Sequence, residues 1–448
     1  MGMIFRRYGA FTGGIDLPDE KDKLLSEPIA VADTPKRLLV PLSPCGGPPA
    51  RPIVSGGSRV AAGDKLAEAA GLDGVDVLAP LGGRVIGISQ AAIATEEGFL
   101  TSPAVELAEL QDAERIVCTE AGRDWHATDP QTLLNQLASS SLTTHRHPLR
   151  PLALWARQAR EARCDTLIAN VVEGQPYVTA DHRLLAEFGW EAVEGLAILG
   201  RAIGAERLIL AVDERYTEHY RNVIEPARLH GIARVAVAHK YPAGADEVLV
   251  KVLTRRPVPA GESAVNVGVA VVGAATCLAV RQQVACGRPL THRVVTVAGD
   301  GVARSGNYWA PLGMSCAELA GTAEGLIHGG PMTGLACPPD AVVGPATDAV
   351  LCLTQAIGPR RSGVPSPCIR CGWCAEHCPA RLNVAALNDD FELGQVDHAR
   401  GAGVMACVEC GVCAYVCPAR LPLTHRVRQL KRTWASASGR TSLGAAPR

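Results

Sequence analysis

The sequence predicts a multidomain α/β protein, and three observations support that class. The first 95 of the 448 residues are short apolar runs separated by glycine and proline, which is typical of a β module. Strand and helix patterns then alternate between residues 96 and 255. Near the C-terminal end, eight of the 16 cysteines form two runs of the same spacing, C-x2-C-x2-C-x3-C-P. The length corresponds to about three domains.

The composition describes a folded protein without the marks of a nucleic-acid binder. Apolar residues make up 47% of the chain, aromatic residues only 4%, and the formal net charge is −1, so neither a positive field nor base-stacking rings are prominent. No secretion signal precedes the cysteines, which fits a reducing compartment. The longest apolar run, Val267 to Val280, is too short to cross a bilayer. Any membrane association is therefore expected to be peripheral or through a partner.

Residues 1–95 contain two stretches with a shared pattern, an apolar run followed by a glycine turn and a second apolar run. They read VSGGSRVAAGDKLAEA and LAPLGGRVIGI. The pair is similar to the barrel-sandwich hybrid of lipoyl and biotinyl carriers. No lysine stands alone at a hairpin tip between the two halves, which favours a structural β module over a carrier.

Residues 96–255 predict a parallel sheet covered by helices, because buried strands alternate with amphipathic helices. The expected strands are 164–172, 206–212 and 233–238, and the expected helices are 181–200 and 216–230. Such sheets bind ligands beyond the carboxyl ends of their strands. The loop from Glu173 to Tyr177 is therefore either a binding loop or an ordinary turn. In the preceding segment, His145 and His147 form an H-x-H pair that fits either a metal site or a polar loop.

Residues 256–355 predict a small α+β module, with a strand from Val265 to Val272 and glycine-rich loops that include HGGPMTG. A linker rich in proline, serine and glycine, residues 356–367, leads to the cysteine region. The tail from Thr424 carries arginine and lysine but no acid. Its first part could form a basic helix, and a basic tail can touch anionic lipid or an acidic partner.

The cysteine runs carry the strongest chemical signal in the chain. Three cysteines on a tight loop can bind three irons of one [4Fe–4S] cube, and in two-cluster arrangements the fourth cysteine of each run binds the other cube. Zinc is the alternative, but zinc sites usually draw on two separated cysteine pairs. We therefore assign two clusters, the first to Cys368, Cys371, Cys374 and Cys417, and the second to Cys407, Cys410, Cys413 and Cys378.

Several motifs, in order, resemble RnfC, the family of peripheral redox subunits of the Rnf electron-transport complex. They are FTGGIDLPDEK, PLSPCGGPPARPIVSGGSRVAAGDKLAEA, KYPAGADEVLVKVLTRRPVPAG, VVTVAGDGVARSGNYW, HGGPMTG and both cysteine runs, and they extend from about Phe11 to Arg426. The resemblance implies a barrel-sandwich hybrid in 1–95, a domain like the complex I flavoprotein in 96–255, an SLBB-like module in 256–355 and a helical, ferredoxin-like two-cluster domain in 356–430. The remaining residues, 431–448, are expected to be a basic, disordered tail.

The resemblance also implies a function. Members of the RnfC family are peripheral proteins on the cytoplasmic side of the membrane, which take hydride from NADH onto FMN and pass single electrons to their clusters. The Rnf complex couples electron flow between NADH and ferredoxin to ion transport. The chain is thus expected to work with other subunits of a membrane redox complex and with ferredoxin or a similar carrier, as part of an NADH:ferredoxin-type oxidoreductase and translocase.

The nucleotide site departs from the family pattern. The family's glycine-rich phosphate loop should precede the strand that ends near Asn170, but the 51 residues from Arg123 to Glu173 contain no glycine. Glycine amides are what lets such a loop approach phosphates. The following motif is half kept, and its residues are the expected contacts to FMN or NADH, namely Asn170, Glu173, Gln175, Tyr177 and Asp181.

Three functions remain open at this point. One is an NADH-oxidising subunit with an unusual nucleotide loop. Another is a relay that has lost flavin and NADH and passes electrons through its two clusters. A third is a redox protein like the cobalamin reductases, although the clusters of that family precede the SLBB module, whereas here they follow it.

Overall fold

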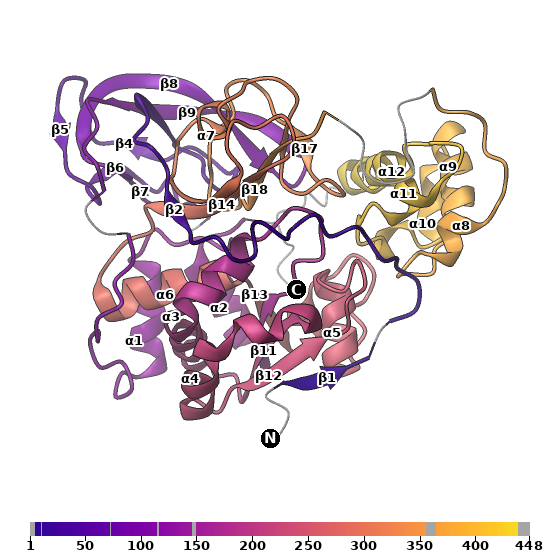
Figure 1. Ribbon diagram of the computed structural model, residues 1–448, viewed down its shortest axis with the longest axis horizontal. Helices are drawn as coiled ribbons and strands as arrows, with labels where there is room; N and C mark the ends of the chain where they lie inside the picture. Colours follow the sequence, from indigo (N-terminus) through magenta and orange to yellow (C-terminus); the bar gives the residue numbers. More distant parts are fainter. Residues whose placement is uncertain are drawn as a thin grey trace.

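The computed structural model describes residues 5–9, 11–71, 73–113, 116–145, 149–354 and 364–437. Figure 1 shows three lobes: a β lobe at the top, an α/β lobe beneath it, and a helical lobe at the right. The helical lobe is formed by the cysteine region. The multidomain α/β class predicted from the sequence is confirmed.

A five-stranded sheet forms the centre of the α/β lobe, and all its strands run parallel in the order β1-β12-β11-β10-β13. Strand β10 is buried along its whole length, as expected for a parallel strand covered on both faces. This confirms the predicted parallel sheet. Its strands are β1 (Arg6–Tyr8), β10 (Thr166–Val171), β11 (Arg207–Asp213), β12 (Ala233–Val237) and β13 (Val269–Val272).

Side-chain alternation along β10 explains how both faces are covered. Leu167 and Ala169 point into one core and Ile168 points into another, because successive side chains in a strand face opposite sides. Helix α5 (Asp246–Thr254) covers the core of Ile168. The helices that cover the other core are α1 (Pro130–Ala138), α2 (Leu152–Glu161), α3 (Ala180–Ile203) and α6 (Ala274–Cys286).

Gly195 lets α3 and α6 approach each other closely. A Cβ atom at Gly195 would lie 1.8 Å from the carbonyl oxygen of Cys277 in α6. We therefore expect Gly195→Ala to lower the free energy of unfolding by about 3 kcal/mol, the upper end of the usual cost of overpacking. Urea unfolding followed by circular dichroism would measure the loss. Gly401→Ala is the matched control, because Gly401 is helical and a Cβ atom there would meet no other atom within 4 Å; equal stability of the two variants would contradict the prediction.

Two local expectations were wrong. The segment from Tyr216 to His230 is not one helix but two 3-10 turns, Glu214–His219 and Arg221–Val223, followed by the short α4 (Ile224–Leu229). Pro226 lies in the first turn of α4, where a missing N–H costs nothing. The strand expected from Val265 begins at Val269 instead. A 3-10 turn, Ala264–Val267, precedes it and ends at Gly268, whose φ of 75° needs glycine.

The β lobe combines two modules around a shared core that includes Leu66 and Leu107 from one and Val295 and Val350 from the other. The first has two sheets, β3-β9-β8-β5 and β4-β6-β7, and the second has a mixed sheet, β17-β16-β18-β14-β15-β2. The strands of the first module are β3 (Arg37–Pro41), β4 (Arg51–Pro52), β5 (Arg59–Val60), β6 (Lys65–Glu68), β7 (Val77–Leu78), β8 (Gly83–Thr95) and β9 (Gly98–Ala108). Those of the second are β2 (Ala30–Val31), β14 (His292–Ala298), β15 (Gly306–Pro311), β16 (Leu326–His328), β17 (Leu335–Ala336) and β18 (Ala349–Cys352), with helix α7 (Cys316–Ala320).

The N-terminal segment connects all three lobes. Strand β1 pairs with β12 in the α/β lobe, and β2 pairs with β15 in the β lobe. Between them, the backbone N–H of Gly14 donates to the carbonyl of His377 in the helical lobe, at 2.8 Å. In Figure 1 this segment, in indigo, runs from β1 past the helical lobe and back to the β lobe.

Short helices make up the third lobe. They are α8 (Trp373–Glu376), α9 (Val384–Glu392), α10 (Val396–Gly401), α11 (Val412–Val416) and α12 (Leu423–Ala437), with a 3-10 turn at Val404–Ala406. Helix α12 continues past residue 430 into the segment expected to be a tail, and residues 438–448 of that segment lie outside the described residues. Most of the predicted linker, up to residue 363, also lies outside them. None of the helices in the described ranges is long and apolar enough to cross a membrane.

Candidate metal centre

The two cysteine runs fold into two loops of the same shape. Arg370 and Gly372 have left-handed φ angles of 56° and 82°, and the equivalent Glu409 and Gly411 have 53° and 84°. In each run two cysteines come before the short helix, one lies within it, and the fourth follows it or forms its C-cap. This repetition places the cysteines of the two runs in matching positions.

Each of two groups of four thiols combines three cysteines of one run with the fourth of the other. Burial raises the pKa of the Cys374 thiol, and the neighbouring thiols that raise it further are Cys371, Cys417 and Cys368. Burial likewise raises the pKa of Cys410, with further contributions from Cys407, Cys413 and Cys378. Cys413 also interacts with Cys374 of the other group, so the two groups are neighbours.

The second group surrounds a pocket of about 380 Å³, lined by all four of its cysteines. The other walls are mainly apolar and include Leu382, Val412 and Val427. Two polar contacts reach the sulfurs: the N–H of Glu409 donates to Cys407 Sγ at 3.4 Å, and Thr424 Oγ1 lies 3.6 Å from Cys413 Sγ. Four thiols around a shared space are the donor set that a [4Fe–4S] cluster requires. These thiols surround a space but do not converge on one point: across the described ranges, no three His, Cys, Asp or Glu side chains lie close enough to bind a single metal ion.

The two groups differ in exposure. Cys371 of the first group is exposed, and so are its neighbours Ile369 and Trp373, at 65% and 50%. In the second group, Cys410 is buried and Cys407 and Cys413 are partly covered. Each group has two buried cysteines, but the first group reaches the surface through Cys371 and the second group has no exposed cysteine.

Contacts from the α/β and β lobes attach the second group to the rest of the molecule. The Tyr241 hydroxyl donates to the carbonyl of Cys410 at 2.6 Å. Gln175 accepts from the N–H of Met332 at 3.0 Å and donates to Thr333 at 2.9 Å. The loop that contains Met332 and Thr333 lies against Gly411, because a Cβ atom at Gly411 would be 2.4 Å from the Met332 carbonyl oxygen. Gln175, an expected flavin contact, thus holds a loop against the cysteine region. Sequence reasoning did not name Tyr241 as a site residue, although it lies in the KYPAGADEV motif.

Asn170 and Glu173, the other leading candidates for a flavin contact, are engaged by the chain itself. Asn170 is fully buried, and its amide donates to the Gly244 carbonyl at 3.0 Å and to Asp246 at 2.9 Å. The Glu173 carboxylate accepts from the N–H groups of Asp181 and His182 in the first turn of α3, at 2.9 and 2.7 Å. Burial raises the pKa of Glu173 to about 7, opposed by these two amides and by a nearby lysine.

That lysine, Lys21, was also missed. It is 1% exposed and donates to the backbone carbonyl of Glu173, and burial lowers its pKa. Of the remaining candidates, Tyr177 is half-buried with a left-handed φ of 67°, and Asp181 lies in the first turn of α3. The structure thus brings Lys21, Glu173 and Asp181 together at the carboxyl edge of the sheet.

The segment that replaces the glycine loop places His145 at the start of α6. His145 is 4% exposed, and its Nδ1 lies 2.9 Å from Thr276 Oγ1 in the first turn of that helix. Burial holds the pKa of His145 well below its usual value, so the ring is neutral. Gly273 caps the start of α6, and the charge of Arg293 also acts on His145, but the described part of the segment before α2 contains no glycine-rich loop. The glycine-rich phosphate loop expected of the family is therefore not found among the described residues of this segment. His147, the other half of the H-x-H pair, lies outside the described residues.

His182 makes the α/β lobe sensitive to acid. The ring is 2% exposed, and burial lowers its pKa to about 3. Below pH 6.5 the His182 ring is protonated in the unfolded chain but stays neutral in the folded chain, so the free energy of unfolding falls as the pH falls. We expect this residue alone to lower the free energy of unfolding by about 1.4 kcal/mol when the pH falls from 7.5 to 5.5. Unfolding of the protein and of His182→Asn should be measured at both values, and an identical pH dependence of the two would contradict the prediction.

Together, a module of two packed β sheets, an all-parallel α/β domain and two groups of four thiols define a multidomain iron–sulfur electron-transfer protein. Family models match in the same order: the RnfC barrel sandwich hybrid domain over residues 9–108, the Nuo51 FMN-binding domain over 151–282, and the 4Fe-4S dicluster domain over 362–430. The chain belongs to the RnfC family, the C subunits of ion-translocating oxidoreductase complexes, as the sequence motifs predicted.

Three relatives illustrate this relationship. The C subunit of the ion-translocating oxidoreductase complex of Rhodobacter capsulatus is 31% identical, over 88% of this chain and 77% of the relative. The protein of the same name from Pseudomonas aeruginosa is 31% identical, over 86% of this chain and 51% of the relative. The C subunit of the proton-translocating ferredoxin:NAD(+) oxidoreductase complex of Clostridium ljungdahlii is 27% identical, over 87% and 85%. The chain spans about half the length of the first relatives that it matches.

Proposed function

We propose that this chain is the iron–sulfur electron-transfer subunit of an Rnf-type ion-translocating oxidoreductase, in which electrons move between NADH or flavin and ferredoxin-level carriers. The first [4Fe–4S] cluster is assigned to Cys368, Cys371, Cys374 and Cys417, and the second to Cys407, Cys410, Cys413 and Cys378. The chain would bind other subunits of the complex from the cytoplasmic side of the membrane, without spanning it.

The observation that carries this proposal is the presence of two adjacent groups of four thiols, each with three cysteines from one run and one from the other. When bound, [4Fe–4S] clusters supply one-electron redox chemistry. The chain would set the reduction potential of the second cluster through its apolar walls and the two polar contacts to Cys407 and Cys413. Nearby, Glu409 accepts hydrogen bonds from Arg428 and Lys431, so these basic residues of α12 are directed toward the cluster region.

One observation favours a narrower function, that of an electron relay without its own flavin. His145 lies in the segment that replaces the expected glycine loop and contacts Thr276, and Asn170 and Glu173 form hydrogen bonds within the chain. Electrons would then enter and leave through the clusters, with the exposed first cluster facing a partner. The two functions differ in one measurable quantity, the flavin bound per chain.

Anaerobic purification with reconstitution of the clusters tests the shared part of the proposal. We expect about eight iron and eight sulfide per chain, as two [4Fe–4S] clusters require. Reduction by dithionite should bleach the visible absorption and produce paramagnetic resonance signals from two interacting clusters. Iron well below eight per chain, or tightly bound zinc in its place, would contradict the assignment.

A further inference from the structure

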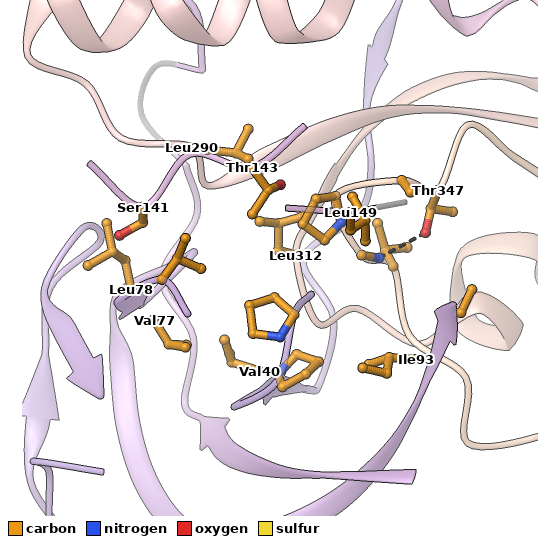
Figure 2. Close-up of a pocket in the computed structure, with 18 of the residues that line it drawn as sticks. Val40, Val77, Leu78, Ile93, Ser141, Thr143, Leu149, Leu290, Leu312 and Thr347 are labelled. Atoms are coloured by element: carbon orange, nitrogen blue, oxygen red, sulfur yellow. Dashed lines mark hydrogen bonds between the residues drawn. The ribbon is translucent and has the colours of Figure 1, made fainter. Parts of the chain in front are cut away.

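A partly open cavity lies where three parts of the chain meet, away from the cysteine runs; its empty space, with adjoining solvent included, is about 690 Å³. Its walls come from the first β module, from the segment between α1 and α2, and from the second β module. Figure 2 shows Thr143 and Leu312 above the space, with Val40 and Val77 below it.

The walls select for an uncharged ligand. Most of the lining is apolar, including Leu78, Ile93, Leu149 and Leu290, and no lysine or arginine is among the described lining residues. The one carboxylate, that of Asp76, is already bonded to Lys65 at 2.6 Å. A charged ligand would lose its hydration without gaining a counter-ion, which is costly in an apolar site.

Thr143 supplies one unused polar group. It is 1% exposed, and its hydroxyl has no hydrogen-bond partner among the described residues. The other buried polar side chains of the lining are satisfied: His328 Nε2 lies 2.9 Å from Thr347 Oγ1, which accepts from the N–H of Gly344 at 2.8 Å. A buried hydroxyl without a partner costs about 1–3 kcal/mol, so an acceptor brought into the cavity would recover that cost.

We propose that this cavity is a binding site for a neutral, mainly apolar ring compound with one carbonyl oxygen, which accepts a hydrogen bond from Thr143. The apolar walls would bury the rings, and the hydroxyl would fix the position of the carbonyl. Because three parts of the chain line the cavity, the ligand would also tie the segment between α1 and α2 to both β modules. This site is distinct from the thiols and from the flavin-type edge of the sheet.

The dye prodan tests the proposal, since it is a neutral naphthyl ketone whose emission shifts to the blue in apolar surroundings. We expect saturable binding to the cluster-loaded protein. Thr143→Val keeps the shape but removes the hydroxyl, and should weaken binding about 5-fold, the value of one neutral hydrogen bond. Ala346→Phe fills the cavity from its half-exposed rim and should abolish the blue shift. Thr254→Val, in α5 and outside the lining, is the matched control and should bind as the unaltered protein does.

Thermal unfolding and the cluster absorption would show that each variant is folded. The absence of saturable binding to the unaltered protein would overturn the proposal. So would binding that survives Ala346→Phe, because the dye would then lie elsewhere. Equal affinity of Thr143→Val and Thr254→Val would overturn the assigned hydrogen bond.

Discussion

Replacing Cys378 and Cys410 together with alanine is expected to destroy one cluster and leave the other intact, with about four iron per chain instead of about eight. Both residues belong to the second group of thiols although they come from different cysteine runs. Replacing Cys374 and Cys378, which belong to the same run, is expected to remove one ligand from each cluster. That variant should retain no intact four-thiol cluster, so both resonance signals should change or vanish.

The two variants distinguish cross-ligation from ligation within each run. If each run held its own cluster, the Cys378/Cys410 variant would lose a ligand from both clusters, and the Cys374/Cys378 variant would keep one cluster intact. Iron analysis and paramagnetic resonance of the dithionite-reduced proteins would measure them. Cys118→Ala combined with Cys337→Ala is the matched control, since these two half-buried cysteines lie outside both runs. The control should keep its full iron content. One intact cluster in the Cys374/Cys378 variant would show that each run holds its own cluster.

Incubation with excess FMN is expected to leave far less than one flavin per chain, and NADH is then expected to leave the cluster absorption unbleached. The physical reason is the missing phosphate loop: the chain has no glycine from Arg123 to Glu173, and the neutral ring of His145 packs against Thr276 at the start of α6. Flavin released by acid from the desalted protein would be measured by fluorescence, on the sample used for iron analysis.

Dithionite provides the positive control for this experiment, because it should bleach the same sample and so prove that the clusters can be reduced. Flavin near one per chain, together with bleaching by NADH, would contradict the relay and support an NADH-oxidising subunit. Bound flavin without bleaching by NADH would mean that the phosphate cradle lies away from the start of α6, and would equally contradict the prediction.

The sequence predicted the parallel sheet and the cysteine region because both leave local signals. Strand β10 is a continuous apolar run, and the spacing of Cys407, Cys410 and Cys413 identifies their chemistry without knowledge of the fold. Helix boundaries were less predictable where turns compete with helices. The segment from Tyr216 to His230 has apolar residues at helical spacing, yet the structure divides it into 3-10 turns and a short helix.

The contacts that decide the site could not be predicted, because they join residues far apart in the chain. Lys21 reaches the carbonyl of Glu173, and Tyr241 reaches that of Cys410. Both side chains bond to backbone groups, which leave no mark in a sequence. The missing glycines did signal a changed nucleotide loop, but only the structure placed His145 against Thr276.

The path of the N-terminal segment has a consequence for how the protein folds during synthesis. Arg6 is partnered by Val235, 229 residues later in the chain, and Tyr8 by Val237. Strand β1 therefore stays without its neighbour during synthesis until β12, which begins at Ala233, has been made. The hydrogen bond from the N–H of Gly14 forms only after His377 has been made as well. Such distant pairing slows folding and prolongs the exposure of unpaired backbone, so the N-terminal segment is expected to close the molecule last.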